Sequence, residues 1–314
     1  MDRIAILIPC YNEELSVAKV VSDAHKYLPE AAVYVYDNNS TDATVARAVE
    51  AGAIVRYEHM QGKGNVIRRM FREVDAQCYI MVDGDDTYDL SSVRELADLI
   101  LEKQADMVVG DRLSSTYYSE NKRPFHNFGN SLVKASINKL FDCKINDIMT
   151  GYRAFSYQFV KSFPVMSRGF EIETEMTIFA VNNNMQVENV VIGYKDRQEG
   201  SYSKLDTYSD GFKVIGTIIR LYREYRPLKF FTIISATLAL LSVLFVIPVL
   251  IDYANTGLVL RFPTLIVCGF VFIAAIQSLF AGMILNNVAQ RNRMETELRL
   301  YDISDRLHDL EEAP

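Results

Sequence analysis

Two long uncharged runs near the end of the chain constrain its fold more than any other feature. They cover residues 230–251 and 264–285, and each contains 22 consecutive residues without Asp, Glu, Lys or Arg. At 1.5 Å per residue, a helix of this length crosses a hydrocarbon core of about 30 Å. A buried pair of core helices is the alternative, although such helices rarely need so long an uncharged run. We therefore expect a transmembrane hairpin over residues 230–285.

The charges that flank the hairpin predict its orientation. Cytoplasmic ends of membrane helices carry an excess of Lys and Arg. Arg261 is the only Lys or Arg in the connecting loop. The outer flanks carry more basic residues: Arg220, Arg223, Arg226, Lys229, Arg291, Arg293 and Arg299. Both termini, and the residues that precede the hairpin, are therefore expected to be cytoplasmic.

Residues 212–229 and 286–314 flank the hairpin and show helical patterns. In the first segment, one side of a helix would carry apolar residues and another side basic ones; the apolar residues are Phe212, Ile215, Ile218, Ile219 and Tyr222. This pattern predicts a juxtamembrane amphipathic helix at an anionic membrane surface, or one that packs on the preceding domain. The second segment is a cytoplasmic tail whose apolar residues are mixed with many charges. A solvated helix and a self-associating helix both remain open there, and with them a dimer or tetramer.

Residues 1–211 are expected to form one domain. Within it, residues 1–110 alternate β-branched runs with stretches of helical period, whereas residues 113–211 are less regular and are expected to complete the sheet and form the acceptor side. Apolar residues recur at helical spacing between these runs, for example at Val17, Val20, Val21 and Ala24. The alternation indicates an α/β domain with a mostly parallel sheet and helices on both faces. The expected strands are residues 3–8, 32–36, 53–57, 78–82, 106–110 and 188–194.

An acidic turn follows the fourth expected strand. Asp83, Gly84, Asp85 and Asp86 place three carboxylates within four positions. These groups repel one another unless a cation lies among them, and oxygen ligands suit Mg²⁺ or Mn²⁺. A plain acidic turn is the alternative, because Asp and Gly are common turn formers.

The other strand ends favour a ligand site. Ligands of parallel sheets bind beyond the carboxyl ends of the strands. Each of these ends carries a polar segment, at residues 9–14, 37–42, 61–65 and 110–112. Each segment alone could be a helix cap or a weak anion-binding loop. Together they predict one site at one edge of the sheet.

Composition excludes several other classes of protein. The net charge of −7 and the pI near 5.3 argue against a nucleic-acid partner. The four cysteines form no CxxC pair, so a disulfide framework or a zinc site is not expected. The first apolar run is too short for a cleavable signal, so the domain is expected to remain in the cytosol.

The polar segments and the acidic turn belong to a series of seven motifs that follow one another along the chain: IPCYNEE, DNNSTDAT, QGKGN, DGDD, GDR, TGYR and RQEGSYSK. With the hairpin after them, the chain resembles the polyprenyl-phosphate glycosyltransferases of glycosyltransferase family two. That group includes dolichol-phosphate mannose synthase and bacterial enzymes that load undecaprenyl phosphate. The resemblance implies a GT-A-like fold, a nucleotide-sugar donor, Mg²⁺ or Mn²⁺, and a polyprenyl phosphate acceptor. It also implies a bacterial plasma membrane and a role in cell wall polysaccharide.

The resemblance assigns roles to matching residues. Metal binding is implied for Asp83 and Asp85, with Thr87 where relatives often have Gln. Catalytic roles are implied for Asp85, Arg112, Arg197 and Lys204. The acceptor phosphate would contact Arg112, Arg123, Asn127 and Ser203, although many relatives have Arg and Ser where this chain has Arg123 and Asn127. Together with neighbouring polar residues, the nucleotide site would comprise Pro9, Tyr11, Asn12, Glu13, Asp37, Asn39, Lys63, Asp83 and Gly84.

The implied reaction needs no general base. A phosphate monoester is largely a dianion at neutral pH, and the four histidines fall in no catalytic-looking motif. Direct attack on the anomeric carbon would invert it. The resemblance also implies UDP-glucose or UDP-N-acetylglucosamine as donor, because mannose-transferring relatives have a DAD-type motif where this chain has DGDDTYD; GDP-mannose is the alternative.

Two other functions fit this sequence less well. A processive polysaccharide synthase of this family carries a QxxRW motif, and the chain has no tryptophan. A non-catalytic membrane scaffold would have no use for Asp83 and Asp85 together with Arg197 and Lys204.

Overall fold

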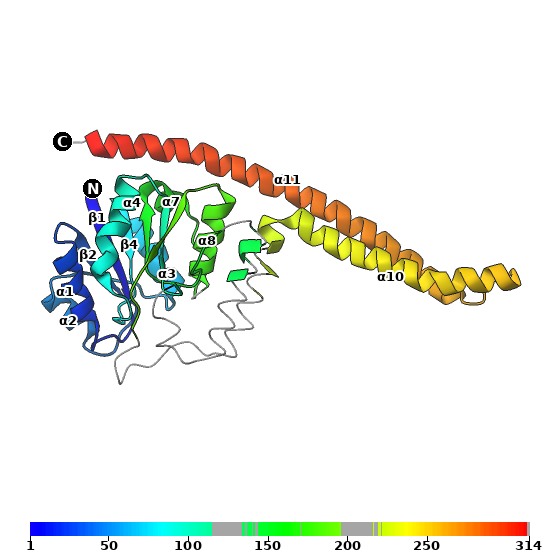
Figure 1. Ribbon diagram of the computed structural model, residues 1–314, viewed down its shortest axis with the longest axis horizontal. Coiled ribbons are helices and arrows are strands. Elements are labelled where there is room, and N and C mark those ends of the chain that lie inside the picture. The colour runs from blue at the N-terminus through cyan, green and yellow to red at the C-terminus, as the bar shows by residue number, and fades with distance from the viewer. Residues whose placement is uncertain are drawn as a thin grey trace. The chain divides into compact units, whose positions relative to one another are not determined.

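The computed structural model describes residues 1–114, 134–135, 137–139, 141, 144–169, 171–195, 216, 219–220 and 222–312 (Figure 1). Their contacts form two compact units, one of residues 1–218 with 296–314 and one of residues 219–295. The first unit contains the predicted α/β domain. The second contains the two apolar helices. Of the predicted juxtamembrane segment 212–229, the described residues before Arg226 are helical.

A seven-stranded sheet forms the centre of the first unit, in the order β3-β2-β1-β4-β6-β5-β7. Strand β6 is antiparallel to β4 and β5, and every other neighbouring pair is parallel. Six strands therefore point the same way, and their carboxyl ends share one edge. The bounds are β1 Asp2–Cys10, β2 Ala32–Asp37, β3 Ile54–Tyr57, β4 Ala76–Met81, β5 Met107–Asp111, β6 Arg153–Ser156 and β7 Val187–Val191.

The mostly parallel sheet confirms the predicted architecture, with two differences. Strand β6 was not predicted, because four consecutive buried residues show no alternation between apolar and polar side chains. The last predicted strand ends early, since β7 stops at Val191 and Tyr194 forms only an isolated bridge with Tyr88.

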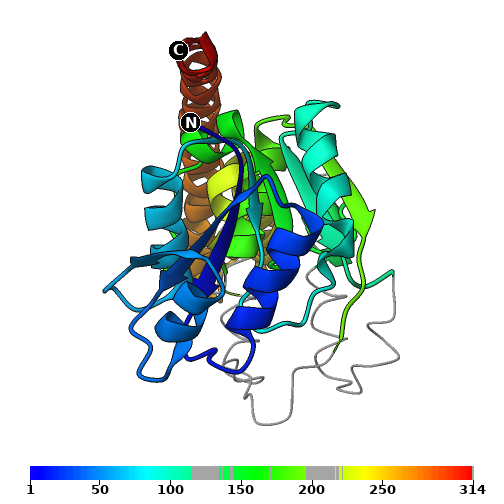
Figure 2. The same ribbon diagram turned by 90° about the vertical axis from the view of Figure 1, so that its left-hand side faces the viewer.

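Helices α1 and α4 cover one face of the sheet (Figure 2). Val20 and Val21 of α1 and Leu96 of α4 join a buried cluster with Ile6 and Ile80 of the sheet. The helical spacing seen in the sequence is therefore the core-facing stripe of these helices. The helices of this unit include α1 Val17–Tyr27, α2 Thr44–Glu50, α3 Lys63–Glu73, α4 Val93–Leu101, α7 Tyr157–Ser162 and α8 Ile172–Asn182.

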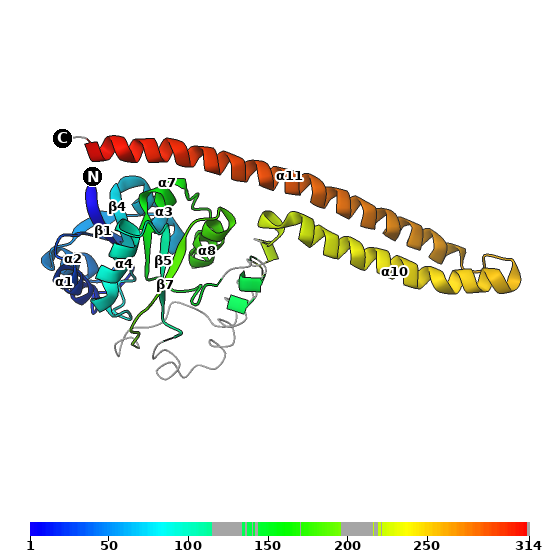
Figure 3. The ribbon, with the colours of Figure 1, turned by 45° about the horizontal axis from the view of Figure 1, so that its top comes forward.

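Helices α3, α7 and α8 pack on the other face through aromatic side chains (Figure 3). The rings of Phe155 and Phe159 stack with centroids 4.8 Å apart, and Phe71 and Phe179 meet this pair edge-on. Edge-to-face and stacked rings are favoured geometries in protein cores. Helices on both faces are thus confirmed.

The second unit contains helix α10, Pro227–Thr256, and most of α11, Phe262–Glu312. The two lie side by side (Figures 1 and 3). Only 11% and 17% of their most apolar windows are buried, which disfavours the alternative of buried core helices. Both are long and apolar enough to cross a membrane. Helix α11 continues through the predicted tail, and α10 is capped after Thr256 by Gly257, whose backbone is left-handed (φ 67°).

Small residues form the contact between α10 and α11. Ser242 donates its hydroxyl to the carbonyl of Cys268 at 2.9 Å. Cys268, Ala275 and Gly282 follow one another at intervals of seven residues and are all buried. A Cβ atom on Gly282 would lie 2.7 Å from the Cβ of Phe231. Small residues at such positions let two apolar helices approach closely.

We predict that Gly282→Leu destabilises the hairpin, because the new side chain collides with Phe231. Overpacking of this kind costs about 1–3 kcal/mol. The midpoint temperature at which the detergent-solubilised protein loses its size-exclusion peak should fall. Gly269→Leu is the matched control in the same helix, because nothing lies within 4 Å of its Cβ position. An equal loss in both variants would contradict this packing.

Candidate functional site

The polar segments predicted from the sequence meet at the carboxyl edge of the sheet. Strands β2, β1 and β4 are direct neighbours, and Cys10 pairs in register with Asp37. Beyond the strands, the Asn38 amide donates to the Cys10 carbonyl at 2.9 Å, and the Val82 amide donates to that of Leu7 at 3.1 Å. The turns that follow these three strands are therefore adjacent.

Asn12 ties the first two turns together. Its backbone amide donates a hydrogen bond to the Ser40 hydroxyl at 2.9 Å, and its side-chain oxygen accepts one from the Thr41 backbone amide at 2.8 Å. Asn12 and Asn39 both have left-handed backbone, with φ of 52° and 67°, a conformation that Asn tolerates well. Ser40 and Thr41 thus join two turns and cap no helix, since α2 begins later, at Thr44.

Asp37 offers an unused acceptor at this edge. The side chain is only 4% exposed, and its Oδ2 accepts the Ser40 amide at 3.1 Å. Its Oδ1 is buried and has no hydrogen-bond partner among the residues that the structure describes. An unpaired buried acceptor is costly. Asp37 is therefore suited to accept a hydrogen bond from a ligand, and the predicted neighbours Pro9 and Tyr11 lie on the adjacent strand end, with Tyr11 37% exposed.

The acidic turn after β4 is held against β1. Ser16 donates its hydroxyl to the Gly84 carbonyl at 2.7 Å. A Cβ on Gly84 would lie 2.6 Å from the sulfur of Cys10, so only glycine fits there. Glu13 is buried, and its amide donates to Thr44 at 2.8 Å.

The three carboxylates of this turn have different partners. Asp86, with φ of 56°, accepts Lys19 at 3.0 Å and Lys195 at 2.9 Å. Asp85 is 6% exposed and accepts the Thr87 hydroxyl at 2.7 Å. Two ammonium groups therefore neutralise Asp86, which leaves Asp83 and Asp85 as the pair suited to a metal. Thr87 holds Asp85, and its assignment as a third ligand stays a prediction.

Asp83 and Asp85 fit a divalent ion that is shared with a substrate. Within the described part of the chain, no group of three or more His, Cys, Asp or Glu side chains forms a complete metal cage. Mg²⁺ is usually bound through one or two carboxylates, together with substrate phosphates and water. Two carboxylates on one turn match that pattern.

Lys63 is a cation at this acidic edge. It opens helix α3 directly after Gly62, and its Nζ lies 2.6 Å from Asp83 Oδ1 and 2.7 Å from Glu173 Oε1. Burial lowers the pKa of Lys63, but attraction to the two carboxylates outweighs burial and raises it overall. Glu173 lies on α8, and the sequence analysis missed it. The acids of the EIETE run gave no sign of which would point inward.

Arg112 follows β5 and is held by Asp147, another residue that the sequence analysis missed. Its Nε lies 2.7 Å from Asp147 Oδ2, and its Nη2 lies 3.1 Å from Oδ1. The guanidinium also lies 5.9 Å and 5.6 Å from the ring centres of Tyr88 and Tyr194. The position of Arg112 is therefore fixed by protein contacts.

The TGYR motif, residues 150–153, packs against the acidic turn and stabilises β6. Arg153 is fully buried in β6 and donates to the Ile148 and Thr150 carbonyls at 2.6 and 3.0 Å. Burial lowers the pKa of Arg153 to about 10. Gly151 packs directly against the carboxylate of Asp83, where a Cβ would collide. The arginine of this motif is thus structural.

Five predicted residues cannot be placed in this geometry. Arg123, Asn127, Arg197, Ser203 and Lys204 lie outside the described residues. Their roles stay predictions.

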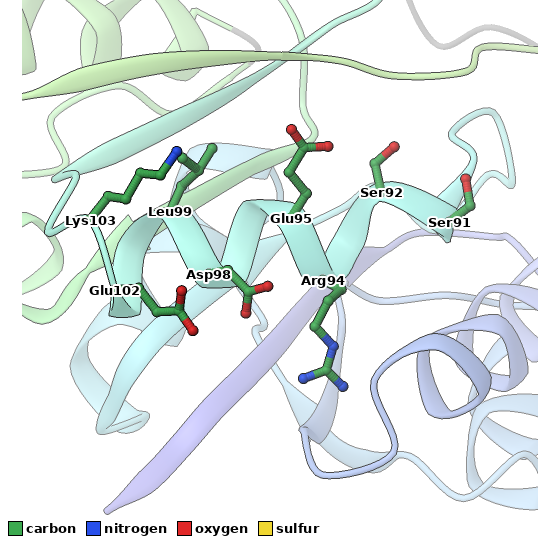
Figure 4. Close-up of a pocket in the computed structure, with 8 residues that line it drawn as sticks. All are labelled: Ser91, Ser92, Arg94, Glu95, Asp98, Leu99, Glu102 and Lys103. Atoms are coloured by element: carbon green, nitrogen blue, oxygen red, sulfur yellow. The ribbon is translucent and has the colours of Figure 1, made fainter.

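A depression along α4 is not part of this site. Figure 4 shows Ser92 and Glu95 pointing to one side of the helix and Arg94 to the other. Arg94 pairs with the exposed Glu30, and no predicted site residue lines the depression. Its lining residues are Ser91, Ser92, Arg94, Glu95, Asp98, Leu99, Glu102 and Lys103.

Comparison with known proteins assigns the family. The model for "Glycosyl transferase family 2" matches residues 5–163. The chain belongs to glycosyl transferase family 2. This glycosyltransferase is 32% identical to glycosyltransferase AglJ of Haloferax volcanii, over 73% of its own length and 75% of that of AglJ. It is 25% identical to the dolichyl-phosphate hexose transferase of the same organism, over 72% and 96% of the two chains.

A solved structure supports the fold of the glycosyltransferase. Glucosyl-3-phosphoglycerate synthase from Mycobacterium tuberculosis, in complex with Mn²⁺ and UDP-glucose, matches with a TM-score of 0.57. The match has 18% sequence identity and covers 70% of this chain and 79% of that protein. The predicted GT-A-like fold is thus confirmed.

We predict that Arg112→Met destabilises the glycosyltransferase domain, because it leaves Asp147 buried without its cation. Breaking such a pair costs about 3 kcal/mol. In a domain of this size, the thermal midpoint should fall by about 6–12 °C. Arg94→Met removes an arginine from an ion pair with 49% and 38% exposed side chains and should shift the midpoint far less. Equal shifts would show that Asp147 does not depend on Arg112.

Proposed function

We propose that this glycosyltransferase moves a hexose from a nucleotide-sugar donor to polyprenyl phosphate, with inversion of the anomeric carbon. The observation that carries the proposal is the placement of Asp37, with its unpaired buried oxygen, and the Asp83–Asp85 turn at the carboxyl ends of β2 and β4, the two strands that flank β1. One edge of the sheet thereby offers an acceptor for a nucleoside and a carboxylate pair for a diphosphate-bound metal.

Charge accounts for the donor side. Asp83 and Asp85 would hold Mg²⁺ or Mn²⁺, which when bound neutralises the charge that develops on a departing diphosphate. The related synthase was solved with Mn²⁺ and UDP-glucose, which supports this pairing of metal and donor. Asn12, Asn39 and Gly84 would line the nucleotide site with backbone and amide groups.

Basic residues account for the acceptor side. Arg112, with the sequence-predicted Arg197 and Lys204, would hold the attacking phosphate against repulsion from the diphosphate. An acceptor phosphate that is already a dianion needs no general base. The likeness to a dolichyl-phosphate hexose transferase supports a lipid-linked acceptor.

The apolar helices account for access to that lipid. With α10 and α11 in the bilayer and both termini cytoplasmic, the acceptor phosphate reaches the site while its polyprenyl chain remains in the membrane. UDP-glucose and UDP-N-acetylglucosamine are the proposed donors, and transfer to undecaprenyl phosphate in a bacterial plasma membrane is the proposed setting.

The test is transfer of radiolabelled sugar into a lipid extract by purified protein with Mn²⁺ and polyprenyl phosphate. UDP-glucose or UDP-N-acetylglucosamine should give a β-linked product, and GDP-mannose should give little. A donor panel without any lipid-linked product would overturn the proposal.

We predict that Asp85→Asn loses at least 100-fold in this transfer, because the neutral amide is a weak ligand for a hard cation. Asp98→Asn is the control, since Asp98 lies on α4 in the depression of Figure 4. It should transfer sugar at the natural rate. Unchanged turnover in Asp85→Asn would contradict the metal assignment.

A further inference from the structure

Lys63 occupies an unusual position between two carboxylates. Its Nζ lies 2.6 Å from Asp83 on the β4 turn and 2.7 Å from Glu173 on α8. The side chains of Lys63 and Glu173 are 9% and 5% exposed, and that of Asp83 is 25% exposed. One ammonium group therefore contacts two carboxylates, and of the two only Asp83 belongs to the acidic turn that is proposed to hold the metal.

The backbone of Lys63 is held in place on both sides. Gly62 has φ of 128°, and the Gly64 amide donates to the Arg168 carbonyl at 3.1 Å. A Cβ on either glycine would collide with the backbone at Ser167 and Arg168. Lys63 can therefore change its partner only by moving its side chain.

Helix α8 stabilises the position of Lys63 through two acidic residues, Glu173 and Glu175. Glu173 contacts the Lys63 ammonium, and Glu175 accepts the Ser167 amide at 3.0 Å. Ser167 belongs to the segment against which the glycines pack. The same helix thus holds the Lys63 backbone in place and supplies its second acceptor.

A metal ion and Lys63 would compete for Asp83. The Asp83 oxygen bound to Lys63 belongs to the carboxylate pair that would hold the ion. Even at an effective dielectric constant of 20, two unit charges 4 Å apart repel by about 4 kcal/mol. The repulsion is larger for a divalent ion. Glu173 offers the displaced ammonium another buried carboxylate 2.7 Å away.

We propose that Lys63 is an internal cation that competes with the divalent metal for Asp83, and that Glu173 is a positioning residue that retains Lys63 when the metal binds. The inference rests on the proposed metal-dependent function and goes beyond it. Without metal, Lys63 neutralises Asp83. With metal, Lys63 stays on Glu173 beside the donor phosphates. A purely structural ion pair would leave metal affinity independent of which partner Lys63 holds.

Metal affinity tests this exchange without turnover. Mn²⁺ is titrated into the whole detergent-solubilised protein without nucleotide, and the free aqueous ion is followed by electron paramagnetic resonance. We predict that Lys63→Met binds Mn²⁺ about tenfold more tightly, a change of about 1.4 kcal/mol. Glu173→Gln should bind it about tenfold more weakly, because Lys63 then loses the carboxylate that would retain it when the metal takes Asp83.

A double variant separates exchange from simple loss of charge. In Lys63→Met/Glu173→Gln, no ammonium remains to be displaced, so affinity should match Lys63→Met within about twofold. If Glu173→Gln weakens binding equally in both backgrounds, Glu173 acts through its own charge and the inference is overturned. Unchanged or weaker binding in Lys63→Met also overturns it. If Lys63→Met does not fold, Lys63→Gln takes its place. A Glu173→Gln variant that binds Mn²⁺ as tightly as the natural protein is by itself enough to overturn the inference.

A matched lysine provides the control. Lys161 is 18% exposed and donates to the Phe71 and Val74 carbonyls, and Lys161→Met should leave Mn²⁺ affinity unchanged. If the natural protein binds no Mn²⁺, the proposed function itself is contradicted. If it binds Mn²⁺ and loses it in Asp85→Asn, but Lys63→Met changes nothing, only the exchange is contradicted.

Discussion

Repulsion among carboxylates at one edge of a parallel sheet is the constraint on which the rest of this structure depends. Asp37, Asp85, Asp86 and Glu173 are each less than 10% exposed, and Asp83 shares the Lys63 ammonium with Glu173. A buried carboxylate needs a cation or several hydrogen bonds. The structure meets this need differently at each position, and those differences separate structural acids from acids that remain available to a ligand.

Asp86 and Asp83 illustrate the two outcomes. Asp86 holds two lysines from separate elements and so joins the acidic turn to α1 and to the segment after β7. Asp83 shares a single lysine with Glu173 and retains some exposure. A site that accepts a divalent ion needs a partner of the second kind. Such a cation neutralises the carboxylate in the absence of metal and has a second carboxylate to bind when the metal is present.

Two motif arginines show that position in a motif does not settle a role. Arg153 is fully buried and bonds to backbone carbonyls, so it stabilises the sheet at β6. Arg112 lies at the strand edge, yet Asp147 and two tyrosine rings already hold it. Loss of activity in an Arg112 variant therefore needs a stability measurement beside it, because breaking a buried ion pair destabilises the domain by itself.

Local patterns in the sequence were enough to predict several elements of the fold. Strand and helix periods predicted β1 to β5, α1 and α4, and run length predicted two helices long enough for a membrane. The family motifs placed Asp37, Asp83 and Asp85 at the carboxyl ends of strands that proved to flank β1 in the sheet. Three features became visible only in the folded chain: β6 enters the sheet antiparallel, Asp147 binds Arg112, and Glu173 shares Lys63 with Asp83. These choices join residues far apart in the chain, and no local period encodes them, because packing alone determines which of several nearby acids points inward.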